Sequence, residues 1–365
     1  MSVTRRYSRH LLIPEVGLEG QHRLSAARVL VVGAGGLGSP ALQYLAAAGV
    51  GRLGVVDDDV VDETNLQRQT IFASADVGRK KAETAAERLY GLNPTIAVDA
   101  IPVRFDATNA RQLVQLYDVV LDCTDRFPTR YLINDVCVLE GKPEVYGSIF
   151  RFDGQVSVFA PTGPCYRCLY PEPPPLESRP TCAEGGVLGA LAGIVGSWQA
   201  NEALKVLLGA GETLRGRLML IDALYARVRE VRFERDRSCA ICGEAPAIRE
   251  ILSQTYDEPQ PDASGAEIDA ADLEQALRGA RLLDVREPHE AVLGSIDGAI
   301  AIPASELEAR MHELDTAAAY VVACRVGAKS LWAVRRLRDA GFDRVIHLKG
   351  GLLAYAARHP EFEFF

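Results

Sequence analysis

Short apolar runs alternate with segments of mixed polarity along the N-terminal third of the chain. Runs of this kind, rich in Val and Leu, are typical of parallel strands that are buried on both faces. Between them, residues 40–48 and the Ala-, Glu-, Lys- and Arg-rich segment 77–89 are predicted helices. The alternation predicts a doubly wound α/β domain, with strands at residues 28–32, 53–57, 96–98 and 119–122.

Two later apolar runs, 155–159 and 218–221, are predicted to add antiparallel or mixed strands to this sheet. The uncharged stretch 185–201 contains five glycines and is shorter than the roughly 20 residues of a membrane-spanning helix. We interpret it as a buried loop and helix. The start of the chain is polar and basic, which predicts no signal peptide. We therefore expect a cytoplasmic protein without a membrane partner.

A second, smaller α/β pattern occupies residues 266–365, with predicted strands at 282–285, 320–323 and 345–348 and a predicted helix at 330–339. Before it, residues 246–265 contain three prolines, many acidic residues and few apolar ones. This composition favours an extended linker. We therefore expect a first domain at 1–245, a linker at 246–265 and a second domain at 266–365.

Composition and charge exclude several classes of protein. The 365 residues are 48% hydrophobic and 24% charged, an ordinary globular mix. The net charge of −9 argues against a nucleic-acid partner, which needs a basic surface. Eight cysteines are too few for a disulfide scaffold in a chain of this size. In a reducing compartment, clustered thiols point to metal binding or catalysis.

A glycine-rich turn joins the first predicted strand to the first predicted helix. Gly33, Gly35 and Gly38 form G-x-G-x-x-G, which lets backbone N–H groups approach a phosphate at a helix N-terminus. Asp57 ends the next strand, where a carboxylate accepts hydrogen bonds from ribose hydroxyls. The turn therefore predicts a nucleotide-binding site. The alternative is that the glycines are required only for packing of the turn.

Charged residues that follow the turn distinguish ATP from NAD. Splitting an α–β phosphate bond builds negative charge on pyrophosphate and needs nearby cations, which Arg68 and Lys81 supply. Residues 122–125 (Asp-Cys-Thr-Asp) end a strand at the ligand-binding edge, where an aspartate can hold Mg²⁺. Each cation taken alone also fits a solvated surface charge.

Two C-x-x-C motifs, Cys165/Cys168 and Cys239/Cys242, supply four thiolates. Two intervening residues let both sulfurs of a motif face one ion, and four thiolates close a tetrahedral zinc site. A closed site has no position for a reactive water, so we expect one structural zinc ion per chain. A redox dithiol is the alternative, although one motif would suffice for it.

Two further cysteines are candidates for sulfur or acyl chemistry. Cys324 follows a strand and opens a helix, with Arg325 and Lys329 nearby. Backbone N–H groups at a helix start form an anion-binding nest, so this loop suits a persulfide. Cys182 follows a proline-rich loop and could reach an activated acyl group. The alternatives are a buried strand-end cysteine at 324 and a small buried hydrophobe at 182.

Residues 5–245 resemble the adenylating enzymes of the MoeB/ThiF type, relatives of ubiquitin-activating enzymes. The resemblance rests on Arg6-Tyr-Ser-Arg9, the glycine turn, Asn65-Leu-Gln-Arg-Gln69, Lys81, Asp122-Cys-Thr-Asp125 and the paired C-x-x-C motifs. It implies a Rossmann-like ATP-binding adenylation domain with a structural zinc site. Arg126 is a departure, because the family usually has asparagine there.

The same resemblance implies roles for individual residues. It implies that Gly36 contacts the nucleotide and that Asp57 holds the ribose. It places phosphates at Asn65, Arg68 and Lys81, and Mg²⁺ at Asp125. It also implies a homodimer in which Arg9 reaches the neighbouring subunit's site.

Residues 266–365 resemble a rhodanese domain, a small α/β fold. The matching segments are Leu283-Asp-Val-Arg-Glu-Pro-His-Glu290, Gly298-Ala-Ile-Ala-Ile-Pro303, the Cys324 loop, and Gly350-Gly351 followed by Tyr355. Within this domain we expect Asp284 and Arg286 to form a structural pair.

Together the two resemblances imply an adenylyltransferase and sulfurtransferase. ATP would adenylate the C-terminal glycine carboxylate of a ubiquitin-like sulfur carrier protein that ends in Gly-Gly. A Cys324 persulfide, charged by thiosulfate or a cysteine desulfurase, would then form the thiocarboxylate, with Cys182 or an external thiol completing the release. The alternatives are carrier conjugation through a Cys182 thioester, an NAD-dependent oxidoreductase, and a sensing protein with an inactive rhodanese module.

Overall fold

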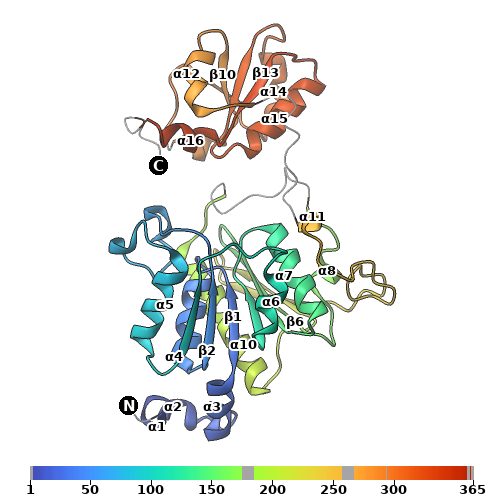
Figure 1. Cartoon of the computed structure of the whole chain (residues 1–365). Coiled ribbons are helices and arrows are strands. Elements are labelled where there is room, and N and C mark those ends of the chain that lie inside the picture. Colours follow the sequence, from blue (N-terminus) through green and yellow to red (C-terminus); the bar gives the residue numbers. More distant parts are fainter. Residues whose placement is uncertain (1–2, 175–184, 257–266, 293, 360–361, 363–365) are drawn as a thin grey trace. The chain divides into compact units, whose positions relative to one another are not determined.

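The computed structural model describes residues 3–174, 185–256, 267–292, 294–359 and 362. These residues belong to two compact units, each described here by itself (Figure 1). Among the described residues, no helix combines the length and the apolar character that a bilayer crossing requires.

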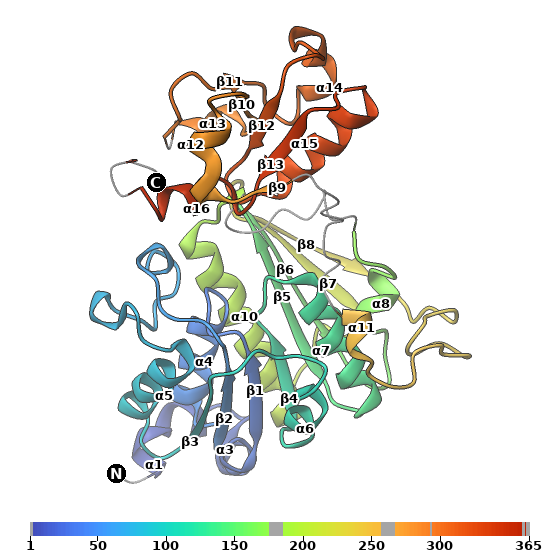
Figure 2. The ribbon, with the colours of Figure 1, turned by 45° about the horizontal axis from the view of Figure 1, so that its top comes forward.

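The first unit is built on one eight-stranded sheet, whose strands can be followed in Figure 2. Their order is β3-β2-β1-β4-β5-β6-β7-β8, parallel from β3 to β5 and antiparallel from β5 to β8. The strands are β1 (Arg28–Val32), β2 (Arg52–Val56), β3 (Ala97–Ile101), β4 (Val119–Asp122), β5 (Glu144–Phe150), β6 (Asp153–Phe159), β7 (Arg217–Asp222) and β8 (Arg227–Arg232). The predicted doubly wound core and its mixed extension are confirmed.

Helices cover both faces of this sheet. On one face α4, α5 and α10 contribute to a core with the inward residues of β1 and β2, and on the other face α6 and α7 do the same. The helices are α1 (Val3–Arg6), α2 (Ser8–Leu11), α3 (Gly17–Ala26), α4 (Gly38–Ala48), α5 (Lys81–Leu92), α6 (Ala110–Gln115), α7 (Phe127–Leu139), α8 (Tyr166–Leu169), α10 (Gly189–Leu208) and α11 (Ser253–Tyr256), with 3-10 turns η1 (Glu63–Asn65) and η2 (Ser74–Asp76).

Several element boundaries differ from the sequence prediction, and two helical segments of the first unit are examples. The helix predicted at 77–89 begins only at Lys81, because Gly78 has a φ of 86° and turns the chain before the helix starts. The stretch 185–201 contributes to the 20-residue helix α10. Leu191 and Val195 are fully buried, whereas Ile194 and Trp198 are 45% and 38% exposed, so the expected burial holds on one face of the helix only.

The first part of the expected linker is packed on the first unit. Tyr256 is 7% exposed and lies with Ile251 in the core beside α7. The backbone N–H of Ile248 donates to the carbonyl of Ala240. Residues 246–256 therefore form part of the first unit, and residues 257–266 lie outside the described part of the chain.

The second unit is a five-stranded parallel sheet in the order β11-β10-β12-β13-β9. Its strands are β9 (Glu267–Ile268), β10 (Arg281–Asp284), β11 (Ile300–Ala301), β12 (Tyr320–Ala323) and β13 (Val345–Leu348). Its helices are α12 (Leu273–Ala276), α13 (Pro288–Ala291), α14 (Leu307–Arg310), α15 (Ala328–Asp339) and α16 (Gly351–Ala356), with 3-10 turns η4 (Ala270–Asp272) and η5 (Met311–Glu313). Apolar clusters lie on both faces of this sheet, so the predicted small α/β unit is confirmed.

Candidate active sites and metal centre

The glycine turn at the end of β1 combines packing constraints with open space. Gly33 has a φ of 98°, and a Cβ there would lie 2.7 Å from the Cys123 carbonyl oxygen. A Cβ on Gly38 would collide with the Gly33 carbonyl. Packing alone therefore requires glycine at these two positions. At Gly35 the nearest atom would be the Gln69 Nε2, at 3.6 Å. Packing does not demand glycine there, which favours close approach of a ligand to the backbone.

Asp57 is fixed against this turn at the end of β2. One carboxylate oxygen accepts the Ala34 N–H at 2.8 Å, and the other accepts the Asp59 N–H at 3.0 Å. Burial raises the pKa of Asp57, and the nearby positive charge of Lys81 opposes that rise. The carboxylate is held in a fixed orientation beside the glycine turn, where a ribose hydroxyl could donate to it.

Both predicted cations belong to segments that adjoin this edge. Arg68 donates to the Thr64 carbonyl at 3.0 Å, and its Cγ would lie 3.4 Å from a Cβ on Gly36. Lys81 is 5% exposed, and its Nζ lies 2.9 Å from the Asp59 carboxylate. Each side chain is held by a local partner, as expected of groups positioned for an anion.

Asn65 lies in η1, in the same segment as Arg68. Its side-chain amide donates to the Thr64 hydroxyl at 3.5 Å. This long contact leaves the amide able to rotate toward another acceptor.

The two aspartates at the end of β4 differ in environment. Asp122 is fully buried and accepts hydrogen bonds from the Thr124 N–H and from Arg130 Nε, at 2.9 and 3.2 Å. Burial raises the pKa of Asp122, and Arg130 opposes the rise. Asp122 therefore organises the strand end. Asp125 is exposed just before α7, so its carboxylate is accessible to solvent.

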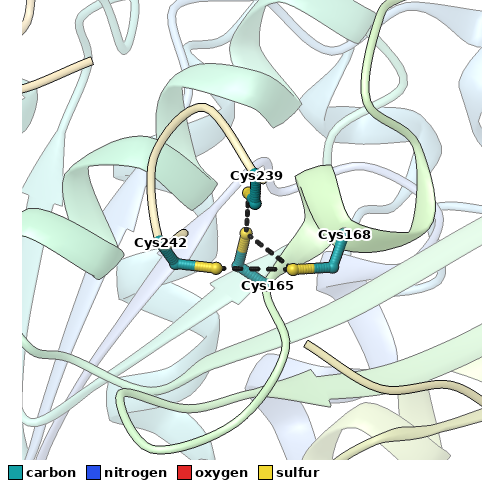
Figure 3. A group of neighbouring side chains, drawn as sticks. All are labelled: Cys165, Cys168, Cys239 and Cys242. Carbon is teal, nitrogen blue, oxygen red and sulfur yellow. Dashed lines mark hydrogen bonds between the residues drawn. The ribbon is translucent and has the colours of Figure 1, made fainter. Parts of the chain in front are cut away.

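The four predicted metal ligands come together in the first unit (Figure 3). Their sulfur atoms all lie within 4.8 Å of one another. The Cys165–Cys239 and Cys168–Cys242 sulfurs are 3.6 and 3.4 Å apart, and the Cys165–Cys168 sulfurs are 3.9 Å apart. Zn–S bonds of about 2.3 Å in a tetrahedron give S···S separations of about 3.8 Å. The donor set therefore fits one zinc ion.

Of two further predicted site residues, the structure describes only one. Arg9 is exposed on α2, so its side chain is accessible at the surface of the described chain. Cys182 lies outside the described residues.

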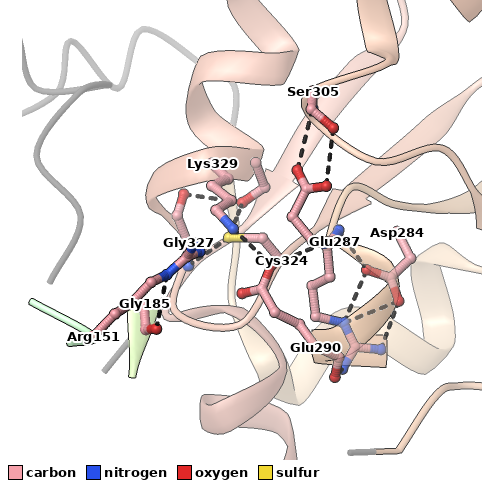
Figure 4. Close-up of polar contacts among 11 residues, drawn as sticks. Arg151, Gly185, Asp284, Glu287, Glu290, Ser305, Cys324, Gly327 and Lys329 are labelled. Carbon is pink, nitrogen blue, oxygen red and sulfur yellow. Dashed lines mark hydrogen bonds and ion pairs between the residues drawn. The ribbon is translucent and has the colours of Figure 1, made fainter. Parts of the chain in front are cut away.

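Cys324 directly follows β12 in the second unit, before the turn that opens α15 (Figure 4). Its sulfur accepts the Gly327 N–H at 3.1 Å and lies 3.6 Å from the Ser330 hydroxyl. Gly327 has a φ of 103°, a backbone conformation that favours glycine at this turn. One N–H of the predicted nest, that of Gly327, is thus directed at the thiol, which is itself 1% exposed.

Neighbouring charges in the second unit are paired. Arg286 makes a bidentate contact with Asp284, with the shortest N···O distance at 2.6 Å, so the predicted structural pair is confirmed. Lys329 Nζ lies 2.6 Å from the carboxylate of Glu290, which is itself 4% exposed.

Glu144 is a buried acid that the sequence analysis did not identify. It starts β5 at 1% exposure, and neither carboxylate oxygen has a hydrogen-bond partner among the described residues. Burial, reinforced by the negative charge of Asp122, raises its pKa well above the usual value of 4.5. In the sequence Glu144 directly follows Lys142 and Pro143, and no local pattern marks it as buried.

Glu144→Gln is expected to stabilise the first unit, and the gain should grow with pH. A raised folded-state pKa means that the folded protein holds this proton more tightly than the unfolded chain does. The wild type therefore loses stability as pH rises above about 4.5, by up to about 1.4 kcal/mol per pH unit. Denaturant unfolding at pH 5 and pH 8 measures the difference, with Trp198 as reporter in a Trp332→Phe background. Equal stabilities of the two proteins at pH 8 would contradict it.

Both units match known protein families. Residues 7–241 match the ThiF family and residues 269–358 match the rhodanese-like domain. The chain therefore belongs to the ThiF family and carries a C-terminal rhodanese-like domain. It is 47% identical over 364 residues to the probable adenylyltransferase/sulfurtransferase MoeZ of Mycobacterium tuberculosis, which covers 96% of this chain and 92% of that protein.

Two other comparisons concern a shorter stretch. The sulfur carrier protein adenylyltransferase of Thermus thermophilus is 54% identical over 253 residues, covering 68% of this chain and 93% of that protein. The crystal structure of E. coli MccB with AMPCPP and MccA matches with a TM-score of 0.60 at 22% identity, covering 67% of this chain and 75% of that one. This last likeness shows the fold alone.

Proposed function

We propose that this chain is an adenylyltransferase and sulfurtransferase that converts the C-terminal glycine carboxylate of a ubiquitin-like sulfur carrier protein into a thiocarboxylate. One observation carries the proposal. A glycine turn with a fixed carboxylate and two held cations lies in the same chain as a cysteine whose sulfur accepts a backbone N–H at the start of a helix. Relatives named adenylyltransferase/sulfurtransferase along nearly the whole chain support it.

In the first step the carrier carboxylate attacks the α-phosphate of ATP and expels pyrophosphate. Asp57 holds the ribose, while Asn65, Arg68 and Lys81 contact the phosphates. Negative charge builds on the departing pyrophosphate, and the positive charges of Arg68 and Lys81 stabilise it. Asp125 would hold Mg²⁺, which supplies further positive charge to the phosphates. The product is a mixed anhydride whose AMP is a good leaving group.

In the second step the terminal sulfur of a Cys324 persulfide attacks the activated carbonyl and displaces AMP. The N–H of Gly327 donates to the Cys324 Sγ, the inner sulfur of such a persulfide, and the other N–H groups at the start of the helix would stabilise the negative charge on the terminal sulfur. An external thiol or Cys182 then attacks the Cys324 sulfur of the acyl disulfide. The S–S bond breaks, the thiocarboxylate leaves with the electron pair, and Cys324 remains as a mixed disulfide that a second thiol reduces.

Other parts of the proposal concern the metal and the partners. A zinc ion held by Cys165, Cys168, Cys239 and Cys242 would link the end of the first unit to its middle. A reducing compartment such as the cytoplasm suits these thiols, and the seven described cysteines are free. The sulfur comes from thiosulfate or a cysteine desulfurase.

We further propose a homodimer. Its support is an exposed apolar surface on α4 and α10, which carry Tyr44, Ile194 and Trp198 at 58%, 45% and 38% exposure. These side chains line a cavity of about 760 Å³. In such a dimer the exposed Arg9 would contact the nucleotide of the partner subunit.

Carrier-dependent exchange of labelled pyrophosphate into ATP tests the first step directly. Each candidate ubiquitin-like carrier is added to the purified enzyme with Mg·ATP. Exchange that requires a carrier with an intact C-terminal glycine is the expected result. An enzyme that binds NAD and shows no exchange with any carrier would overturn the proposal.

Arg68→Ala is expected to lower this exchange by about 100-fold or more, because one preorganised donor to a developing charge is typically worth that much. The rate of exchange at saturating carrier measures the effect. Arg232→Ala is the matched control, since that side chain is 85% exposed on β8. An Arg68→Ala enzyme with an unchanged rate would remove Arg68 from the phosphate site.

A further inference from the structure

An arginine inside the first cysteine motif is tied to α7. Arg167 lies between Cys165 and Cys168 and is 9% exposed. Its Nε and Nη2 donate to the two oxygens of Asp135, at 2.8 and 2.7 Å. Asp135 is fully buried on α7. A buried bidentate pair of this kind holds both partners in one geometry.

The same carboxylate also holds the end of the first unit. The Tyr256 hydroxyl donates to Asp135 Oδ2 at 2.8 Å, across 121 positions of sequence. Tyr256 belongs to α11 and is 7% exposed. Asp135 therefore joins the segment that carries two of the metal ligands to the last described residue before the second unit.

Two apolar contacts add to this attachment. Ile248 packs against the four-cysteine cluster, and Ile251 packs against the core beside α7. Residues 246–256 are thus attached to the first unit at Ile248, Ile251 and Tyr256. The four-cysteine cluster contacts Ile248 directly. It is linked to Tyr256 through Arg167 and Asp135.

We propose that Asp135, Arg167 and Tyr256 form an anchor that sets how far the sulfur-carrying unit can reach from the adenylation unit. These are positioning residues, and the inference rests on the proposed function. Eleven peptide units separate Tyr256 from Glu267, which limits their Cα–Cα distance to about 40 Å. With attachment only at Cys242, 25 peptide units would allow about 90 Å. The anchor therefore confines Cys324 to a smaller volume and raises its effective concentration at the adenylate.

Tyr256→Ala is expected to release this anchor. Hydrogen–deuterium exchange of residues 246–256 should become about tenfold faster or more, because a buried hydrogen bond to a charged acceptor is lost together with ring packing. In a single turnover with a preloaded Cys324 persulfide, thiocarboxylate formation should slow about twofold, because Ile251 stays packed and leaves about 16 peptide units before Glu267. Carrier-dependent pyrophosphate exchange should not change.

Three comparisons make the test decisive. Tyr225→Ala removes a tyrosine that is 66% exposed and should change neither measurement. Tyr256→Phe keeps the ring and should accelerate hydrogen exchange less than Tyr256→Ala. Removal of the metal with a chelator should accelerate exchange of residues 246–256 in the wild type.

The outcomes separate the anchor from the proposed function. Unchanged hydrogen exchange in Tyr256→Ala would overturn the anchor, whatever the enzyme catalyses. Faster hydrogen exchange with undiminished sulfur transfer would overturn its effect on reach. Absence of pyrophosphate exchange in the wild type would instead refute the adenylation step and leave the hydrogen-exchange result intact.

Discussion

Cys324→Ala is expected to abolish thiocarboxylate formation and to leave carrier-dependent pyrophosphate exchange unchanged. The sulfur of Cys324 is the only atom of the loop that can carry a persulfide, and it accepts the Gly327 N–H at 3.1 Å. The residues assigned to adenylation belong to the other compact unit. The carrier should therefore accumulate as its adenylate, without the gain of about 16 Da that replacement of oxygen by sulfur brings.

Intact-mass measurement of the carrier distinguishes its adenylate from its thiocarboxylate. A variant with a smaller expected effect serves as a control. Ser330→Ala removes a hydroxyl 3.6 Å from the Cys324 sulfur and should slow sulfur transfer without abolishing it. If Cys324→Ala still forms thiocarboxylate at the wild-type rate, the sulfur does not pass through this cysteine. The rhodanese-like domain would then be accessory to a different route.

Cys239→Ser is expected to eliminate metal binding and to destabilise the first unit strongly. A metal at the four cysteines closes the loop of 70 residues between Cys168 and Cys239. A cross-link of that length is worth about 4 kcal/mol in loop entropy alone. For a unit of this size such a loss lowers the melting temperature by about 10 °C. The rest of the coordination energy adds to this effect.

Metal analysis and thermal unfolding of the same samples check this expectation. Cys324→Ala is the matched control, because it removes a cysteine from the other unit and should retain one zinc ion per chain. A wild-type protein that contains no metal and melts at the same temperature as Cys239→Ser would favour a redox dithiol. It would also remove the metal from the attachment of residues 246–256.

Local patterns in the sequence determined much of this protein. The apolar runs predicted β1, β2 and β4 within one residue of each boundary, because a strand buried on both faces leaves few residue types available. The glycine turn and the Cys324 loop were also predicted, since each depends on neighbours a few positions away. The C-x-x-C spacing predicted which four cysteines meet, because metal ligands come in pairs at short range.

Features that depend on distant partners could be found only in the folded chain. Composition predicted a linker at 246–265, yet Tyr256 is buried against Asp135 from 121 positions away. Composition does not record this hydrogen bond, the Ile248–Ala240 backbone hydrogen bond or the apolar contacts of Ile248 and Ile251, because their partners lie outside the segment. Glu144 likewise looks like an ordinary polar residue in the sequence, and its environment comes entirely from the sheet and α7 packed around it.

The sequence by itself thus determined which chemical groups this protein carries and the short turns that present them, because those turns follow from the torsional preferences and spacing of adjacent residues. The tertiary structure decided which groups meet across the chain and which segments are fixed. Burial and pairing energies depend on neighbours in space, and no local pattern records them.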